Sequence, residues 1–437
     1  MSLPVEEPRR SFARELLDAA LAAVDPAQAV TRHFASVEQR LAREGIERVR
    51  VAAVGKAAWP MARAARRLLG ERLEAGVVLT RYGHAGTEAL PPLQVMEGGH
   101  PVPDAKGVAG TAAMRRLLEG ASGRTLVLFL ISGGGSALLV QPAAGLSLED
   151  KRQATESLLR CGAEIGEINA VRKHLSAIKG GRAARLAAPA GVLALIVSDV
   201  IGDRLDVIAS GPTTPDSSSY AQALAVLRRH RISHQVAPAV IAHLEKGAAG
   251  DLPETPGPDD PLFDRVENIL VAGNRLAVEA AVDAARQAGW PAQAGPSDVQ
   301  GEARRVGVEM ARLARTLGDG PCCRVSGGET TVHVRGPGRG GRNMELALAF
   351  AIEIAGAEAV TLLSAGTDGS DGPTDAAGAM VDGRTVPRAL SRGLDPRVFL
   401  ERNDSYEFFR RAGGLLVTGP TGTNVMDLQI LLVGRAP

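Results

Sequence analysis

The chain is poor in aromatic residues, in cysteine and in net charge. Phe, Trp and Tyr make up 3% of its 437 residues, so side chains on which nucleic-acid bases could stack are scarce. The formal net charge of +1 offers no general attraction for nucleic acid or for anionic membranes. Its three cysteines, of which Cys322 and Cys323 are adjacent, form neither a disulfide framework nor a CxxC metal site, and we interpret them as buried apolar residues.

Long apolar runs and several enzyme motifs are missing as well. The longest aliphatic runs, such as LVLFLI at 126–131, are too short to span a bilayer, and the N-terminus lacks a basic segment followed by an apolar core. We therefore expect a cytoplasmic protein that binds neither membranes nor nucleic acid. The chain contains no GxxxxGK[ST] and no HExxH motif and no Ser/His/Asp spacing, which argues against P-loop, zincin and serine hydrolase chemistry.

What the chain does have is an alternation of apolar runs with Ala/Arg/Glu/Leu segments of helical period. Apolar residues make up 45% of the chain, and its length predicts two or three domains. The alternation is typical of βαβ units around mostly parallel sheets. The Pro-, Gly- and Asp-rich stretch at 247–263 is the best boundary. We predict two α/β domains, residues 1–246 and 262–437.

The same patterns predict individual elements. In the first region we expect strands at RVRVAAV, GVVLT, LQVME, TLVLFLI and GVLALIV and helices at about 12–24, 27–44, 56–69, 106–119, 147–160 and 164–178. In the second we expect strands at NILVAG, CCRVSG, TTVHVRG, VTLLSAG and NVMDLQILLV and helices at about 274–288, 299–317 and 343–355.

Glycines gather in four loops that border apolar runs, at 132–136, 326–334, 336–343 and 364–375. In the first loop, successive backbone amides could cradle a phosphate or a carboxylate, although a tight strand-to-helix turn would use the same glycines. Lys56 directly follows the strand VRVAAVG and could reach a phosphate as a point charge, whereas most lysines in such segments are simply solvated. These loops predict anion binding.

The third loop, Gly336 to Gly341, matches GxGxxG between a predicted strand and a predicted helix and is formally a dinucleotide fingerprint. It carries Pro337 in its tight bend, and Arg339 and Arg342 favour bidentate binding of an anion over a dinucleotide contact.

Carboxylates cluster after two predicted strands, as Asp199, Asp203 and Asp206 and as Asp368, Asp371 and Asp375. Magnesium prefers a few carboxylates together with water and substrate phosphates, although Asp-Gly pairs are also common in turns. Glu329 could face the same site, or lie exposed in a hairpin. His100 and His174 are the histidines in unusual settings.

Together these motifs resemble the type II glycerate kinases, the glycerate 2-kinase family with a C-terminal MOFRL domain, many members of which are labelled hydroxypyruvate reductases. The resemblance covers nearly the whole chain. It rests on VGKAA, GGHPVPDAKG, LISGGGSALL, INAVRKHLSAIKGGRAARLA, SDVIGDRLDVIASGPTTPD, SGGETTV, GRGGRNMELALA, SAGTDGSDGPTDAAG and TGTNVMDLQILL.

The resemblance implies ATP-dependent phosphorylation of D-glycerate to 2-phosphoglycerate, with Mg²⁺ required. It also implies a Rossmann-like N-terminal domain, a smaller MOFRL domain and an active site in the cleft between them. By motif match, the essential lysine of the family falls on Lys56, and its essential arginine on Arg342, with Arg339 as a nearby competitor.

Our mechanistic hypothesis assigns the candidate groups as follows. Lys56 and Arg342 contact the transferred phosphoryl group, and Asp199 holds Mg²⁺ or accepts the proton of the 2-hydroxyl. Arg172 and Lys173 bind the glycerate carboxylate. ATP is bound by Ser132, Gly133, Gly134, Gly135 and Ser136 and by Gly327, Gly328 and Glu329, and Mg²⁺ by Asp206, Asp368 and Asp371.

Two other classes stay open. The GxGxxG loop and the label history favour an NAD(P)H-dependent hydroxypyruvate reductase. Against it, the chain has no fingerprint at a first βα turn with an acidic residue about 20 positions further on. A non-catalytic anion-binding protein would have lost the lysine, arginine and aspartates, which are all present. We expect a monomer or a homodimer.

Overall fold

The computed structural model describes residues 6–318 and 320–435. The chain forms two compact units, one of residues 26–271 and one that joins the described part of residues 1–25 to residues 272–437. The first helix, α1 (Glu6–Ala23), therefore packs with the C-terminal half of the chain. The two domains expected from the sequence, residues 1–246 and 262–437, remain a prediction.

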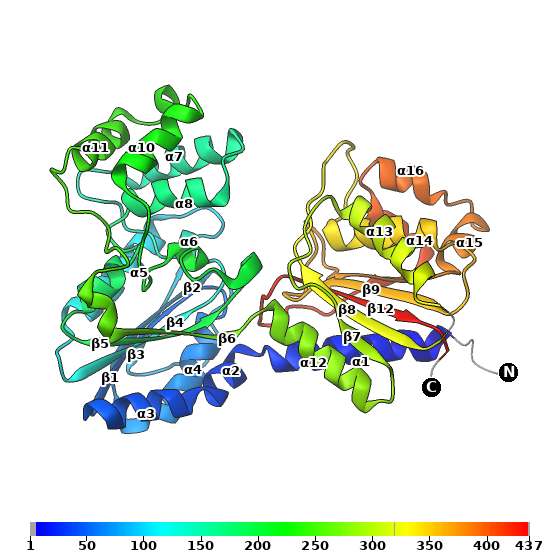
Figure 1. The fold of residues 1–437 in the computed structure, drawn as a ribbon, viewed down its shortest axis with the longest axis horizontal. Coiled ribbons are helices and arrows are strands. Elements are labelled where there is room, and N and C mark those ends of the chain that lie inside the picture. The colour runs from blue at the N-terminus through cyan, green and yellow to red at the C-terminus, as the bar shows by residue number, and fades with distance from the viewer. Residues whose placement is uncertain (1–5, 319, 436–437) are drawn as a thin grey trace. The chain divides into compact units, whose positions relative to one another are not determined.

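The unit of residues 26–271 is built on a six-stranded sheet in the order β3-β2-β1-β4-β5-β6 (Figure 1). Its strands are β1 (Arg48–Val54), β2 (Leu73–Arg81), β3 (Leu93–Gly98), β4 (Thr125–Ile131), β5 (Gly191–Val197) and β6 (Val266–Ala272). From β3 to β5 all neighbours pair in parallel. Every residue of β4 and β5 is buried, as expected for strands covered on both faces.

This strand order is that of doubly wound α/β sheets, in which the chain moves outward from β1 in one direction and resumes at β4 in the other. The expected α/β class is confirmed. The finer expectation, that the unit is Rossmann-like, remains a prediction.

Helices cover both faces of this sheet, with α3 and α4 on one face and α5 and α6 on the other (Figure 1). Their bounds are α2 (Pro26–Arg32), α3 (Phe34–Glu44), α4 (Ala58–Leu69), α5 (Ala105–Glu119), α6 (Gly135–Leu138) and α9 (Arg182–Ala187). The single helix expected over 27–44 is wrong, because the chain forms two helices that meet at His33, whose ring hydrogen-bonds the carbonyl of Ala29.

Four further helices of this unit pack around an apolar core of their own. They are α7 (Leu148–Arg160), α8 (Ile165–His174), α10 (Tyr220–Arg229) and α11 (Pro238–Ala248) (Figure 1). Leu158, Val171, Leu227 and Leu244 are among the buried residues of that core. This helical layer provides one wall of the cavity described below.

The second unit contains a six-stranded sheet in the order β11-β10-β9-β12-β8-β7. Its strands are β7 (Ala292–Ala294), β8 (Cys322–Gly328), β9 (Val360–Gly366), β10 (Gly378–Asp382), β11 (Leu415–Leu416) and β12 (Asp427–Val433). Only β7 and β8 pair in parallel, and the other neighbouring strands are antiparallel. The expectation of mostly parallel sheets is wrong here, because β12 inserts between β8 and β9 and runs antiparallel to both.

Figure 1 shows α1 and α12 on one face of this sheet and α13 and α14 on the other. The helices, besides α1, are α12 (Asn274–Gln287), α13 (Ala303–Thr316), α14 (Arg342–Glu353), α15 (Thr385–Leu390), α16 (Pro396–Glu401) and α17 (Ser405–Ala412). None of the helices in the described ranges is long and apolar enough to cross a membrane.

The strand expected at TTVHVRG is not formed. Residues 330–341 run as an irregular loop with one isolated bridge, from Thr331 to Glu302. Val334 is 77% exposed, so the apolar alternation of this segment does not correspond to a buried face. A segment of high β-propensity forms a strand only where a partner strand and a packing surface are available.

Candidate active site

The loops that follow β1 and β4 meet where the strand order of the parallel sheet reverses. In sheets of this kind, ligands bind outside the carboxyl ends of the strands at that point. The backbone N–H of Lys56 donates to the carbonyl of Gly133 at 2.8 Å, and the N–H of Ala57 donates to Ser132 Oγ at 3.0 Å. These bonds fix Lys56 beside the glycine loop of residues 132–136.

Three side chains pack against this glycine loop so closely that larger residues would not fit. A Cβ on Gly133 would lie 2.0 Å from Asp199 Oδ2. A Cβ on Gly134, which has φ +82°, would lie 3.0 Å from His100 Cδ2 and 3.2 Å from Lys56 Cγ. The structure thus brings together Lys56, the glycine loop and Asp199, which the sequence placed at the ends of three different strands.

The glycine loop offers a row of backbone donors. Within the described residues, the N–H groups of Gly133, Gly134, Gly135 and Ser136 donate to no protein acceptor. Gly133 and Gly135 are buried, and a buried N–H without an acceptor carries a free-energy penalty. Successive donors of this kind form an anion-binding nest.

His100 adds a neutral ring to the same place. Burial, followed by the positive charges of Lys56, Arg81 and His84, lowers the pKa of His100 to about 4. The ring is therefore uncharged at neutral pH and can accept or donate a hydrogen bond without adding to the positive charge.

The segment after β5 shows backbone strain beside the glycine loop. Asp203, Ala209 and Ser210 have φ between +51° and +60°, a region that side chains other than glycine rarely adopt. Ser210 Oγ lies 3.0 Å from Ser136 Oγ and donates to Asn169 Oδ1 at 3.1 Å. Strained positions of this kind cluster at functional sites, where the surrounding structure maintains them.

The residues expected to bind the substrate carboxylate have different surroundings. Arg172 lines a cavity of about 490 Å³ together with His100, Gly134 and Ser136. Lys173 is buried, and its Nζ lies 3.1 Å from Asp216 Oδ1, so it already has a counter-charge. Asp206, expected as a metal ligand, accepts two hydrogen bonds from Arg204.

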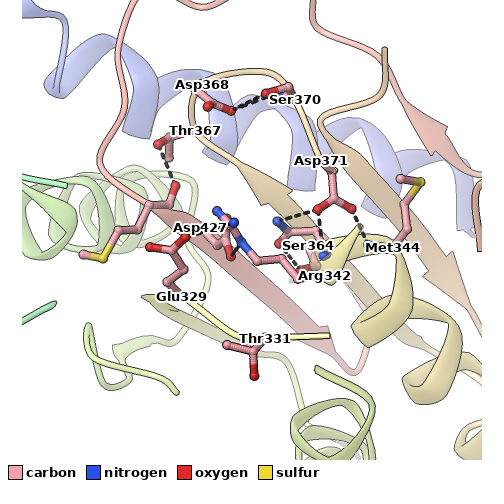
Figure 2. A network of polar contacts seen from close by, with 12 residues as sticks. Glu329, Thr331, Arg342, Met344, Ser364, Thr367, Asp368, Ser370, Asp371 and Asp427 are labelled. Atoms are coloured by element: carbon pink, nitrogen blue, oxygen red, sulfur yellow. Dashed lines mark hydrogen bonds and ion pairs between the residues drawn. The ribbon is translucent and has the colours of Figure 1, made fainter. Parts of the chain in front are cut away.

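A second cluster, in the other unit, surrounds Arg342 at the first turn of α14 (Figure 2). Its Nε and Nη2 donate to the two carboxylate oxygens of Asp427 at 2.6 and 2.9 Å, and its Nη1 lies 2.9 Å from Glu329 Oε1. Asp427 is completely buried at the start of β12. The bidentate pair fixes the plane of the guanidinium.

The electrostatics of this cluster follow from burial of opposite charges. Burial alone would lower the pKa of Arg342, but the hydrogen bonds to Asp427 and the charges of Asp427, Glu329 and Asp371 raise that pKa above its ordinary value. Burial also raises the pKa of Asp427, although the contact with Arg342 opposes this effect. Arg342 therefore stays charged at any accessible pH.

Two of the expected metal ligands accept hydrogen bonds within the protein. Asp371 accepts hydrogen bonds from the backbone N–H groups of Asn343 and Met344, at 3.1 and 2.8 Å, and so caps α14 (Figure 2). Burial raises the pKa of Asp371 to about 7, against the effect of those two donors. Asp368 accepts from the N–H and Oγ of Ser370.

No group of three or more His, Cys, Asp and Glu side chains that could hold a metal ion occurs in the described ranges. A magnesium ion bound by one or two carboxylates and by substrate phosphates does not need such a group. The assignments of Asp206, Asp368 and Asp371 to Mg²⁺ remain predictions.

Of Gly327, Gly328 and Glu329, two already use their backbone N–H groups in bonds within the protein, so fewer amides are left to bind a phosphate than the sequence suggested. The N–H of Gly327 donates to Pro296 O and the N–H of Glu329 to Val299 O, each at 2.9 Å. Gly327 also packs on Asn274, because a Cβ there would lie 2.0 Å from Asn274 Oδ1. These bonds join the end of β8 to residues 296–299, and the role of Gly327, Gly328 and Glu329 in binding ATP remains a prediction.

The GxGxxG loop lacks the structural context of a dinucleotide fingerprint. No strand precedes it, and its glycines allow close packing on residues 402–405, since a Cβ on Gly338 would lie 2.5 Å from Arg402 O. Arg339 stacks on the ring of Tyr406 at 4.0 Å from its centroid. Of the two arginines, Arg342 is therefore the one built into a cluster of charges.

Known proteins are similar to this chain over nearly its whole length. Residues 12–245 match the family described as a domain of unknown function (DUF4147), and residues 322–427 match the MOFRL family. A D-glycerate 2-kinase from Thermotoga maritima is 43% identical over 433 residues, which cover 98% of this chain and 99% of the relative. The chain belongs to the glycerate kinase family that carries a MOFRL domain.

The family resemblance inferred from the sequence is therefore confirmed, and the fold agrees with it. A crystal structure of a glycerate kinase from Thermotoga maritima matches with a TM-score of 0.89 and 42% identity, covering 98% of this chain and 100% of that one. A relative from Agrobacterium vitis, 39% identical over 441 residues that cover 97% of this chain and 94% of the relative, is named as a hydroxypyruvate reductase. Both labels thus occur among relatives of the glycerate kinase family.

Sequence reasoning missed three charged residues that contact the candidate sites: Asp427, Lys151 and Lys179. Asp427 interrupts the apolar run NVMDLQILLV, and a carboxylate in a central buried strand is a signal that would have found it. Lys151 lies in an expected helix and Lys179 directly after one, and neither has a local sequence signal for burial. Their burial depends on how distant segments pack.

Proposed function

We propose that the protein transfers the γ-phosphoryl group of ATP to the 2-hydroxyl of D-glycerate and releases 2-phosphoglycerate and ADP. The observation that carries this proposal is the similarity, over nearly the whole chain, to a relative named D-glycerate 2-kinase. The site chemistry supports it independently, because it combines backbone donors, a lysine, an arginine and carboxylates. Phosphoryl transfer depends mainly on positioning and on stabilising charge with groups of these types.

In this proposal the phosphates of ATP bind to the N–H groups of the loop 133–136. Support comes from the row of amides without protein acceptors and from the place of the loop at the reversal of strand order. Lys56 is partly exposed and lies beside Gly134, where its ammonium would act as a point charge on a phosphate.

Arg342 stabilises the transferred phosphoryl group. A guanidinium has five N–H donors, and three of its nitrogens already bind Asp427 and Glu329 through one donor each. Its other donors, held in a fixed plane by Asp427, would contact phosphoryl oxygens.

Asp199 accepts the proton of the glycerate 2-hydroxyl. The oxygen of that hydroxyl attacks the γ-phosphorus of ATP, and the bond between this phosphorus and the bridging oxygen of ADP breaks. The contact of Asp199 with the glycine loop through Gly133 supports its role. Mg²⁺, when bound with ATP, would neutralise phosphate charge. In the alternative in which Asp199 holds the ion, its carboxylate and the phosphates are the oxygen donors that fit Mg²⁺. Asp206 is a further predicted ligand, already paired with Arg204.

The experiment that tests the proposal measures ADP formation by the purified protein with ATP, Mg²⁺ and D-glycerate. A parallel reaction with NADH and hydroxypyruvate measures NADH oxidation. We expect ADP formation that depends on D-glycerate and no oxidation of NADH. Oxidation of NADH without formation of ADP would instead establish the reductase activity for which the Agrobacterium relative is named.

We also keep three expectations as part of the proposal. These are a cytoplasmic location, a monomer or homodimer, and the absence of a nucleic-acid or membrane partner. Size-exclusion chromatography with light scattering tests the second of them.

A further inference from the structure

The cavity of about 490 Å³ lies between the helical layer and the loops at the end of the parallel sheet. One wall comes from α7 and α8, which contribute Lys151 and Arg172. The opposite wall comes from the loop after β3, with His100, and from the glycine loop, with Gly134 and Ser136. A ligand here would lie directly beside the proposed phosphate-binding amides.

Lys179 is the most deeply buried cation of this cavity, with 2% of its surface exposed. Its Nζ donates to Ser136 O at 2.9 Å and to Ala209 O at 3.4 Å. In its protonated form the side chain has three N–H donors, so one is left beyond these two carbonyls. The side chain therefore joins the glycine loop to the strained turn while retaining a donor for a ligand.

Lys151 has the same kind of environment on the other wall. It is 8% exposed, and its Nζ donates to the carbonyls of Arg172 and Leu175 at 3.3 and 2.8 Å. These bonds attach α7 to the end of α8, which carries Arg172. When Lys151 is protonated, these two bonds leave its third N–H donor for a ligand.

The two buried lysines of this cavity have no carboxylate partner in the part of the chain that the structure describes. The charged groups that act on the pKa of Lys179 are Lys151 and Arg172, both positive. The acidic residues at the rim, Glu149 and Glu156, are exposed and pair with Arg152 and Arg160. By contrast, the nearby Lys173 is neutralised by Asp216.

We propose that Lys151, Lys179 and Arg172 form the site that binds the carboxylate of the acid substrate, with Lys173 outside it. The inference rests on the proposed function and deepens it, because it names the groups that select an acid over a neutral polyol. Buried cations without a partner are costly, and an anionic ligand removes that cost. The cavity has the size of ordinary small-molecule sites.

The kinetic test compares the wild type with Lys179→Met and Lys151→Met, and uses Lys246→Met as a control at an exposed lysine of the same unit. Methionine keeps most of the side-chain length without the charge, and replacing a buried charge by an apolar group is usually tolerated by the fold. We expect the KM for D-glycerate to rise at least about tenfold in both variants. The KM for ATP should stay within about twofold of the wild type in Lys151→Met, which does not contact the glycine loop, as should both constants of the control.

A wild-type KM for D-glycerate in both variants would overturn the inference while leaving the proposed function intact. A rise in the KM for ATP alone would overturn it too, by assigning the lysines to the nucleotide. If the wild type itself formed no ADP with D-glycerate, the proposed function would fail first.

A second measurement does not depend on any variant. Burial lowers the pKa of Lys151 to about 7 and that of Lys179 well below its ordinary value, and a bound carboxylate would raise both. Titration calorimetry of the wild type with D-glycerate at pH 8, in the presence of ADP and in buffers of different ionisation enthalpy, should therefore show net proton uptake. Binding without proton uptake, or no binding, would contradict the inference.

Discussion

Lys56 and Arg342 are the residues on which the proposed chemistry depends most directly. Each is fixed by bonds that leave part of its charged group for a ligand: Lys56 through its backbone to Gly133, and Arg342 through Asp427. Both were found from the sequence, because each occurs in a short motif that resembles the family. Asp427 was missed, although a carboxylate that interrupts an apolar run is a sequence signal for a buried charge.

Replacing either cation should abolish most turnover without unfolding the protein. We expect Lys56→Ala and Arg342→Lys each to lower kcat at least about 100-fold, since removal of one group that stabilises transition-state charge has effects of this size. Lysine cannot reproduce the bidentate contact of Arg342 with Asp427. Steady-state kinetics measure kcat, and circular dichroism checks that the variants are folded. Lys246→Ala, at an exposed lysine, is the control. Near-normal turnover in either variant would refute that assignment.

The burial of Lys151 predicts a pH dependence of stability. Its pKa is about 7 in the folded protein, against about 10.4 in an unfolded chain. Between these values the unfolded chain holds a proton that the folded chain has lost, so this residue makes stability rise with pH, by up to about 1.4 kcal/mol per pH unit. Urea unfolding from pH 7 to 9 should therefore show the wild type gaining stability relative to Lys151→Met. A constant difference would show that Lys151 titrates normally.

At the scale of elements, the loops between strands and helices determine the site. The sequence predicted the glycine loop of residues 132–136 correctly in place, because an all-apolar strand and a run of glycines define its start. It predicted the strand at TTVHVRG wrongly, because β-propensity does not reveal whether a partner strand is present. It also could not show that β12 inserts between β8 and β9, since strand order depends on contacts between distant segments.

The close packing of Gly133 on Asp199 predicts a specific effect on activity. Gly133→Ala would place a Cβ 2.0 Å from Asp199 Oδ2, so the carboxylate must move away from the glycine loop. We expect kcat/KM to fall at least about tenfold, whereas the midpoint of thermal unfolding changes little because the end of a side chain can move. The matched control is Gly166→Ala in α8, where no atom lies within 4 Å of the added Cβ. Equal activity of the two variants would argue against a role for this contact.

At the scale of the whole molecule, the N-terminal helix belongs with the C-terminal half of the chain. In α1, Arg10 pairs with Asp382 at 2.6 Å, and the ring of Phe12 stacks on that of Trp290 with centroids 5.4 Å apart. The sequence placed this helix in the first domain by proximity along the chain. Only contacts between its apolar face and the second sheet reveal where it packs.

A cavity under α1 should therefore loosen the C-terminal unit. Leu16 is 1% exposed, and Leu16→Ala should lower the free energy of unfolding by about 2 to 5 kcal/mol. Hydrogen exchange measured by mass spectrometry should become faster in α12 and β12, which contact α1, than in β1 to β5. The exposed neighbour Glu15→Ala is the control. Faster exchange confined to β1 to β5 would place α1 with the other unit.

The central claim is the transfer of a phosphoryl group to the 2-hydroxyl of D-glycerate, and phosphorus NMR of the product tests it most directly. In the proton-coupled spectrum, a phosphate on C2 is split by the one hydrogen of that carbon, whereas a phosphate on C3 is split by two. The account predicts the C2 pattern, formed only with ATP and D-glycerate together. A C3 phosphate, or no phosphorylated acid, would contradict it.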